Sequence, residues 1–209
     1  GLTQAELMSC HRVLSVPATI SGCNALSEMD RKILAKHKAT AVVTPLSDAK
    51  QGRTCADILA CVKDGMNVAL GTDGAIEAGN LDMFEVMRGA AMAVRASQGK
   101  ANALPAPAAL MMATVSGARA QGRADECGMI KVGMDADLCL VDFSAPHLMP
   151  CHNVPNALVF SAKGGDVAMT MVRGKKLYVN GKFPTLDISA AVQELMEYAI
   201  PKLFDEQKS

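Results

Sequence analysis

Short apolar runs alternate with helical patterns through the first 120 residues of the chain. The apolar runs are continuous, end in Gly- or Pro-containing turns, and cover residues 17–21, 39–44 and 66–70. Helical segments are expected at residues 2–14, 27–38, 54–64, 81–97 and 107–121. Continuous apolar strands that alternate with helices are typical of a parallel sheet covered on both faces. The pattern therefore predicts an α/β fold.

A different pattern begins near residue 128. Short strands separated by Gly-containing turns are expected at residues 128–143 and 167–183, where Asn180-Gly181 is a strong hairpin signal. An amphipathic helix follows at residues 186–203. We therefore expect three parts, which are an α/β layer at 1–122, a β module at 123–185 and a C-terminal helix at 186–209.

Composition narrows the possible partners and the cellular location. The 209 residues are 50% hydrophobic, which allows a sizeable core. Twenty-one basic and 21 acidic residues give a formal net charge of zero, which argues against a nucleic acid or an anionic membrane as partner. No signal peptide or membrane span is expected. The seven cysteines form no CxxC pair, which predicts buried thiols in the reducing cytoplasm.

The strongest chemical signal is the segment LGTDG at residues 70–74. It places Asp73 in a Gly-flanked turn directly after an apolar strand. In a β/α barrel, the carboxyl ends of the strands carry the chemistry. A carboxylate there can hold a metal or accept a proton from metal-bound water. The alternative is that Asp73 only caps its own turn.

Six segments occur in an order that resembles a known family. They are AVVTPLSD at 41–48, VALGTDG at 68–74, NLDMFE at 80–85, ATVSGA at 113–118, GMIKVGMDADL at 128–138 and VRGK at 172–175. The series resembles the amidohydrolase superfamily, in the branch of methylthioadenosine/S-adenosylhomocysteine deaminases and atrazine-chlorohydrolase-like proteins. The resemblance implies the C-terminal part of a (β/α)8 barrel, with strands six to eight and the following helices, plus part of a small β-sandwich.

The resemblance also implies roles for individual residues. Members of the family hold zinc or iron with a His-x-His pair after strand one, histidines after strands five and six, and an Asp after strand eight, while a Glu after strand five moves the proton. Asp73 matches the metal-binding and catalytic Asp, and Ser47 and Asp48 match a substrate-binding loop. That loop usually reads Ser-Asn in the family, so Asp48 adds a negative charge beside the expected substrate pocket. Gly22 stands where the strand-six His is expected. The other ligands would precede Gly1, so we expect no metal or cofactor for this chain alone.

Structural or surface roles, rather than metal binding, are expected for the remaining candidate ligands. Cys23, beside the strand-six position, is expected to be a buried thiol rather than a substitute ligand. His11, His37, His147 and His152 are not spaced as ligand pairs and are expected to lie at the surface or in packing.

The leading interpretation is the C-terminal portion of an amidohydrolase-type hydrolase. A complete member acts on a C–N or C–Cl bond of a purine- or triazine-like small molecule, whereas this chain alone is expected to be inactive. The alternative is a catalytically degenerate member with an assembly or binding role, which Gly22 and Asp48 favour. A nucleotide-dependent oxidoreductase is disfavoured, because no GxGxxG follows a strand.

A partial barrel also predicts a partner. Three strands leave two open edges, which invite pairing with another chain. Side chains such as Val42, Val43, Val68 and Leu70 would each forfeit about 1.5–3 kcal/mol of burial. We therefore expect the missing N-terminal half, or a second copy of the chain, to cover them.

Overall fold

The computed structural model describes residues 1–204 and divides the chain into two units. The first unit consists of Gly1–Asp135 and Phe143–Asp166. The second contains Ala136–Asp142 and the residues from Val167 onward. The sequence grouped residues 123–185 in one module, whereas contacts assign residues 123–135 and 143–166 to the first unit.

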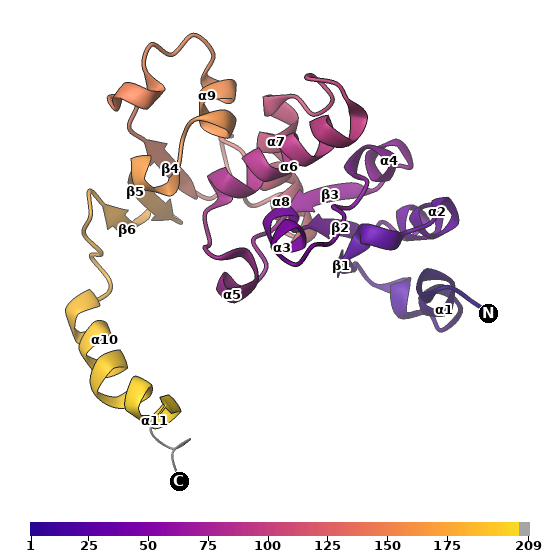
Figure 1. Ribbon diagram of the computed structural model, residues 1–209, viewed down its shortest axis with the longest axis horizontal. Coiled ribbons are helices and arrows are strands. Elements are labelled where there is room, and N and C mark those ends of the chain that lie inside the picture. The colour runs from indigo at the N-terminus through magenta and orange to yellow at the C-terminus, as the bar shows by residue number, and fades with distance from the viewer. Residues whose placement is uncertain (205–209) are drawn as a thin grey trace. The chain divides into compact units, whose positions relative to one another are not determined.

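The first unit contains a parallel sheet of three strands, β1 (Thr19–Ser21), β2 (Thr40–Val43) and β3 (Asn67–Leu70). The spatial order β1-β2-β3 follows the chain (Figure 1). The prediction of three parallel strands in sequential order is confirmed. Because the strands are parallel, the loops that follow them lie along one edge.

Helices fill the connections of the first unit. They are α1 (Gln4–Cys10), α2 (Glu28–Lys36), α3 (Pro45–Lys50), α4 (Ile58–Lys63), α5 (Ala75–Ala78), α6 (Met83–Gln98), α7 (Ala106–Ala113), α8 (Val115–Ala120) and α9 (Val154–Phe160). Short 3-10 turns lie at Val13–Ser15, Cys23–Ala25, Pro146–Leu148 and Gly164–Asp166. Helices α4, α6, α7 and α8 pack against β3.

Three predicted helices are shorter than the sequence pattern indicated, and the one expected at 54–64 begins only at Ile58. The helix expected at residues 2–14 ends at Cys10, because Arg12 takes a left-handed φ of 58°. The helix expected at 107–121 is divided at Thr114, whose hydroxyl donates to the Leu110 carbonyl at 2.8 Å. Bonds of this kind to the preceding turn often bend helices.

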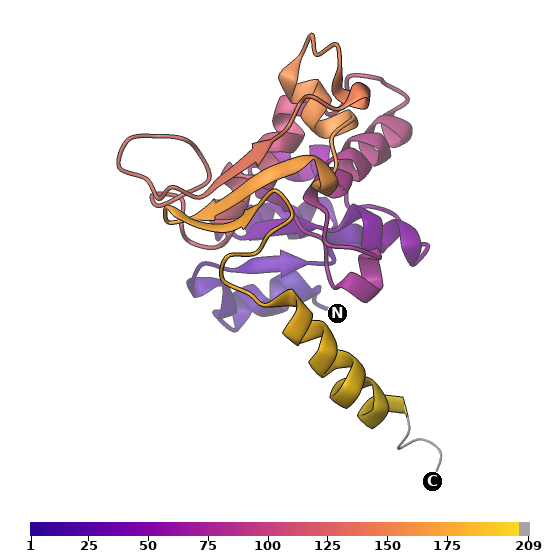
Figure 2. The same ribbon diagram turned by 90° about the vertical axis from the view of Figure 1, so that its left-hand side faces the viewer.

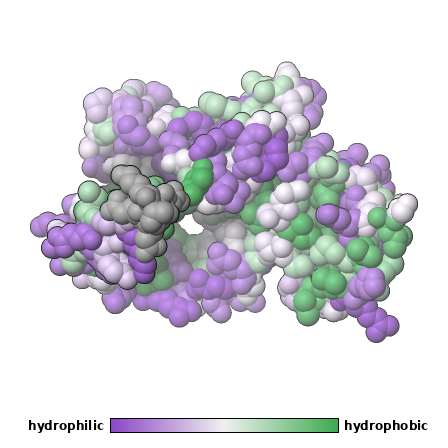
Figure 3. Space-filling model, turned by 60° about the horizontal axis from the view of Figure 1, so that its bottom comes forward, coloured by the Kyte–Doolittle hydropathy of each residue, from purple (hydrophilic) through white to green (hydrophobic). Residues whose placement is uncertain are grey.

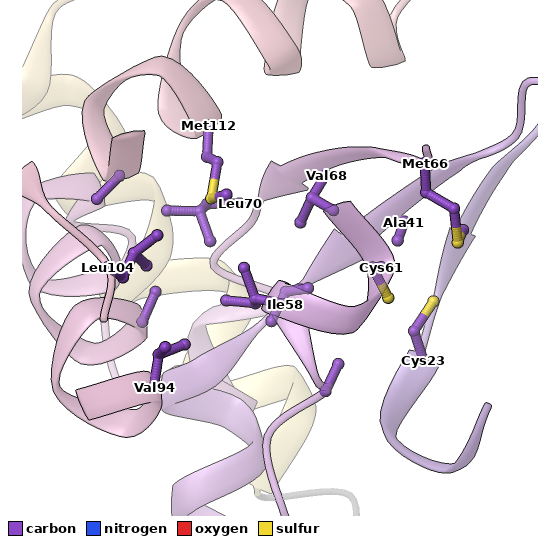
Figure 4. Close-up of a cluster of buried hydrophobic side chains, with 14 of the residues drawn as sticks. Cys23, Ala41, Ile58, Cys61, Met66, Val68, Leu70, Val94, Leu104 and Met112 are labelled. Carbon is purple, nitrogen blue, oxygen red and sulfur yellow. The ribbon is translucent and has the colours of Figure 1, made fainter. Parts of the chain in front are cut away.

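The core lies between the sheet and the helices that follow it. Val43, Val68 and Leu70 are only 1%, 2% and 7% exposed. Figure 4 shows Val68 and Leu70 among side chains from α4, α6 and α7, including Ile58, Val94 and Met112. The expectation that these strand residues lose their burial is therefore wrong, because helices of the same chain cover them. Val42, on the opposite face, is half-buried.

The second unit contains an antiparallel sheet. Its strands are β4 (Leu138–Val141), β5 (Val167–Val172) and β6 (Lys175–Val179), in the order β4-β5-β6 (Figure 2). The antiparallel β module is confirmed, although only β4 forms within the stretch 128–143. The Asn180-Gly181 turn closes a single bridge between Val179 and Lys182.

A helical segment ends the second unit. It consists of α10 (Ile188–Glu194), a π-helical turn at Leu195–Ala199 and α11 (Ile200–Phe204). The π-helical turn lies just before Pro201, which has no N–H to continue the regular ladder. No helix over residues 1–204 is long and apolar enough to cross a membrane.

The cysteines only partly follow the prediction of buried thiols. All seven are free. Cys23, Cys61 and Cys127 are buried, Cys55 is intermediate, and Cys10, Cys139 and Cys151 are exposed. The expectation is therefore wrong for the three exposed thiols, which are spread over the chain.

Asp30 ties the beginning of α1 to the beginning of α2. Its carboxylate accepts the Ser27 hydroxyl at 2.7 Å and the Thr3 hydroxyl at 2.5 Å. These hydrogen bonds, with that of Ser27 the larger, hold the pKa of Asp30 below its ordinary value against the opposing effect of burial. Thr3 and Ser27 are the N-caps of the two helices, so one carboxylate joins both caps.

We predict that protonation of Asp30 at low pH lowers the free energy of unfolding of the chain. Because its folded-state pKa is lowered, its contribution is present above the unfolded value of about 3.9 and is lost as the pH falls through the folded value. Thr3→Val removes one donor and should move this loss to higher pH. Chemical denaturation between pH 2 and 7, with an NMR titration of Asp30, measures both effects. An unchanged titration of Asp30 in Thr3→Val would contradict the assignment.

Candidate functional site

The carboxyl edge of the parallel sheet carries the candidate site. The turn after β3 is joined to β2 by the Gly71 N–H, which donates to the Val43 carbonyl at 3.0 Å. Asp73 in this turn has a left-handed φ of 61°, a conformation that Asp tolerates better than most residues. The Gly74 N–H donates to Asp73 Oδ1 at 3.0 Å. Asp73 therefore caps its own turn and is also exposed at the carboxyl edge of the sheet.

Ser47 reaches Asp73 from the neighbouring strand's loop. It lies in α3, which begins with Pro45 directly after β2 and packs against α5 and α6. Ser47 is fully buried, and its hydroxyl donates to Asp73 Oδ2 at 2.8 Å. The structure thus brings together two residues that the sequence proposed from separate segments.

Asp48 lies in a different environment from the one expected. The residue is 2% exposed, and its Oδ1 lies 3.1 Å from Arg53 Nε. The Arg53 backbone N–H also donates to the Asp48 carbonyl at 2.8 Å. The negative charge of Asp48 is therefore paired within its own loop.

The sequence interpretation missed Gln51 and Arg53. Gln51 Nε2 donates to Ser47 Oγ at 3.0 Å, and Arg53 Nη1 donates to Gln51 Oε1 at 2.5 Å. Gln51 caps α3 and follows Ser47 by four residues, the spacing at which helical side chains meet. That spacing was the available signal.

Gly22 follows β1 at the same edge of the sheet. It has a left-handed φ of 70°, and a Cβ placed on it would meet no atom within 4 Å. Glycine offers no side-chain donor, so the position that the family resemblance assigns to a histidine carries no ligand.

Cys23 does not replace the missing imidazole. It is 3% exposed, and its Sγ donates to the Ile20 carbonyl at 3.4 Å. Burial, with a smaller effect of Cys61, raises the pKa of the Cys23 thiol to about 11. Figure 4 draws Cys23 at one end of the cluster of buried side chains, with Cys61 and Met66 in the same part of the view. Cys23 is therefore a protonated, buried thiol at neutral pH.

The histidines have other partners or lie at the surface. His37 contacts the Ser9 hydroxyl and the Leu14 carbonyl, each at 3.1 Å, and His147 pairs with Asp166 at 2.9 Å. His11 and His152 are exposed. Over residues 1–204, no group of three or more His, Cys, Asp or Glu side chains is arranged to hold a metal. Because a bound zinc takes three or four protein ligands, the described residues by themselves do not fit one.

Comparison with known sequences decides the family. The pattern of the amidohydrolase family matches residues 6–177. The chain belongs to the amidohydrolase family. The resemblance inferred from the six ordered segments is thereby confirmed.

Curated relatives of this amidohydrolase chain include nucleoside deaminases. It is 42% identical over 172 residues to 5'-deoxyadenosine deaminase of Methanosarcina acetivorans, covering 82% of this chain and 39% of the relative. It is 39% identical over 187 residues to 5-methylthioadenosine/S-adenosylhomocysteine deaminase of Moorella thermoacetica, covering 90% and 44%. The chain therefore spans about two fifths of the length of these relatives.

Solved structures with similar folds include metal-containing hydrolases. An adenosine deaminase from Xanthomonas campestris with bound zinc superposes with a TM-score of 0.86 at 31% identity, covering 93% of this chain and 45% of that one. Atrazine chlorohydrolase from Arthrobacter aurescens complexed with zinc gives 0.77 at 22% identity, covering 85% and 40%. The second likeness shows a shared fold alone.

We predict that the 209-residue chain by itself retains no stoichiometric zinc, because the described residues supply no set of three ligands. Elemental analysis after dialysis against zinc-containing buffer and then metal-free buffer measures the content. Asp73→Asn is the matched variant and should give the same low value. One zinc per wild-type chain that disappears in Asp73→Asn would contradict this prediction.

Proposed function

We propose that this chain is the C-terminal portion of an amidohydrolase-type deaminase that cleaves a ring C–N bond of a purine nucleoside. In this proposal β1, β2 and β3 are the sixth to eighth strands of a (β/α)8 barrel. The observation that carries it is the Asp73 carboxylate, held by Ser47 at the carboxyl edge of the sheet. The 42% identity to a 5'-deoxyadenosine deaminase supports the choice of reaction.

The role proposed for Asp73 follows from its hydrogen bonds. Hydrolytic deamination adds water to a ring carbon and releases ammonia, so a group must accept a proton from the water. Ser47 and the Gly74 N–H each occupy one carboxylate oxygen of Asp73. An ionised carboxylate has about four lone-pair sites, so both oxygens keep capacity to accept a proton. The two donors fix the carboxylate while leaving it able to act as a base.

A second candidate function is a degenerate member with an assembly or binding role. The observation that favours it is Gly22, where a side-chain ligand is absent and no neighbouring atom fills the space. Under this alternative, Asp73 is retained as a turn residue and the chain does not support turnover even within a complete barrel.

A chimera separates the two functions. We predict that replacing the matching segment of the Methanosarcina acetivorans deaminase by that of this chain gives a protein that deaminates 5'-deoxyadenosine. Asp73→Asn should then lower kcat by about 100-fold or more, the usual effect of losing a general acid–base group. Glu77→Gln, a carboxylate four residues later, is the control and should leave kcat unchanged. The change in ultraviolet absorbance of the purine ring measures the rate.

The Gly22→His variant of the chimera tests the alternative that the chain is a degenerate member. A Cβ at position 22 meets no atom within 4 Å, although the left-handed backbone costs about 1–2 kcal/mol. A folded chimera that is inactive until Gly22→His is introduced would favour the degenerate member. Inactivity of the folded chimera both with and without Gly22→His would refute the hydrolase proposal.

We also propose that the remainder of the barrel, or a second copy of the chain, covers the β1 edge. In the described part of the chain, β1 pairs with β2 on one side only. Large apolar side chains are exposed nearby, and Figure 3 shows apolar surface on its right-hand side, where the N-terminal elements lie. These side chains are Leu2, Leu7, Val13, Val16 and Met29. Exposed apolar surface beside an unpaired strand favours association.

We predict that the isolated chain self-associates at micromolar concentration. A stable contact should bury on the order of 1,600 Å² in total. The double variant Val13→Lys/Val16→Lys should weaken association, because both residues lie just before β1 in the chain and are more than half exposed. Met92→Lys, at an exposed position on α6, is the control. Sedimentation of the wild-type chain as a compact monomer that melts cooperatively would overturn the prediction.

A further inference from the structure

We propose that Gln51 and Arg53 position Asp73 through Ser47, as a hydrogen-bond relay of fixed direction. The inference rests on the proposed function in one respect, which is that Asp73 is the reacting carboxylate. The relay runs Arg53, Gln51, Ser47, Asp73, and each link is a side-chain hydrogen bond.

The chemistry of the donors sets the direction. A guanidinium group has donors and no acceptor, so the Gln51 oxygen faces Arg53 and its NH2 group faces Ser47. Ser47 then accepts from Gln51, and its one hydroxyl proton is directed to Asp73 Oδ2. The charge of Arg53 thus determines, two side chains away, which way the Ser47 proton points.

The buried position of Ser47 strengthens the two hydrogen bonds that set this direction. Ser47 is fully buried, so water does not compete for its hydroxyl as it would at the surface. Hydrogen bonds in buried surroundings are stronger and reinforce one another, which applies to the two part-buried links at Ser47, whereas the Arg53–Gln51 link is exposed. Asp73 lies in a left-handed turn, and Ser47 is the side chain that reaches it from α3. Loss of the Ser47 proton would leave Asp73 Oδ2 without that donor.

Asp48 anchors the outer end of the relay. Its buried carboxylate holds Arg53 Nε, while Arg53 Nη1 is the atom that meets Gln51. The Arg53 side chain is 45% exposed and that of Asp48 only 3%, so Arg53 keeps a buried carboxylate paired. The effect of the ion pair in this proposal is geometric, because it fixes the guanidinium group that orients the Gln51 amide.

Gln51→Glu tests the relay, since Glu has nearly the same shape but cannot donate from its carboxylate. It keeps the contact with Arg53, so a merely structural role for Gln51 predicts an unchanged or more stable chain. The relay predicts instead that the Ser47 hydroxyl turns to the new carboxylate and leaves Asp73. The Asp73 side-chain ¹³C signal should then shift, and the correlation between the Ser47 hydroxyl proton and Asp73 should disappear, as is also expected for Ser47→Ala.

Controls keep the NMR test independent of activity and of folding. Lys50→Gln, in the same helix but bonded to the Ile76 carbonyl, should leave the Asp73 signal unchanged. Asp48→Asn/Arg53→Met removes both charges together and frees the Gln51 amide to rotate, so it should reduce the same Ser47 correlation if Gln51→Glu does not fold. An Asp73 signal and a Ser47 correlation that stay as in the wild type in a folded variant would refute the relay.

The chimera supplies the functional readout. Gln51→Glu there should lower kcat about tenfold with little change in KM, since in this proposal Gln51 acts on the reacting carboxylate of Asp73 and not on the bound substrate. A chimera without any activity contradicts the deaminase proposal but leaves the NMR result intact, so the two failures are distinguishable. An unchanged kcat for Gln51→Glu in an active chimera would refute the positioning role.

Discussion

Parallel pairing of β1, β2 and β3 is the constraint on which the site depends. It brings the loops after all three strands to one edge of the sheet, although Gly22, Ser47 and Asp73 lie far apart in sequence. The pairing is in turn held by helices of the same chain, which cover Val43, Val68 and Leu70 on one face. The Ser47–Asp73 hydrogen bond is therefore a consequence of the sheet register together with the packing of α3, and neither loop could form it alone.

Much of this arrangement could be predicted from the sequence because it depends on local chemistry. Continuous apolar runs gave the three strands, and the ordered motifs gave the family and the position of Asp73. Helix ends were harder to predict. The break at Thr114, for example, depends on one hydroxyl group that donates back to the Leu110 carbonyl. The burial of Val68 and Leu70 was mispredicted, because an argument from a closed barrel ignored the covering by α4, α6 and α7.

The environment of Asp48 shows where sequence reasoning reaches its limit. The family resemblance placed Asp48 as an added negative charge beside a substrate pocket. Its burial and its pairing with Arg53 depend on the path of the chain after α3, which brings a residue five positions later back to it. Composition and periodicity do not specify that path. Gln51, by contrast, reaches Ser47 through the i, i+4 spacing of α3, a signal that the sequence did contain.

The two departures from the family pattern are therefore of different physical kinds. The extra charge of Asp48 is balanced within its loop, so the fold accommodates it and the carboxylate of Asp73 keeps an ordered donor. The change at Gly22 is not balanced, because no neighbouring side chain enters the space and Cys23 stays protonated in the core. The loop that orients Asp73 is thus intact, whereas the position beside β1 has lost its donor. Because the Asp73 carboxylate is held by an ordered donor while Gly22 offers no side-chain donor at the same edge, the Gly22→His comparison tests the proposed working site against the degenerate alternative.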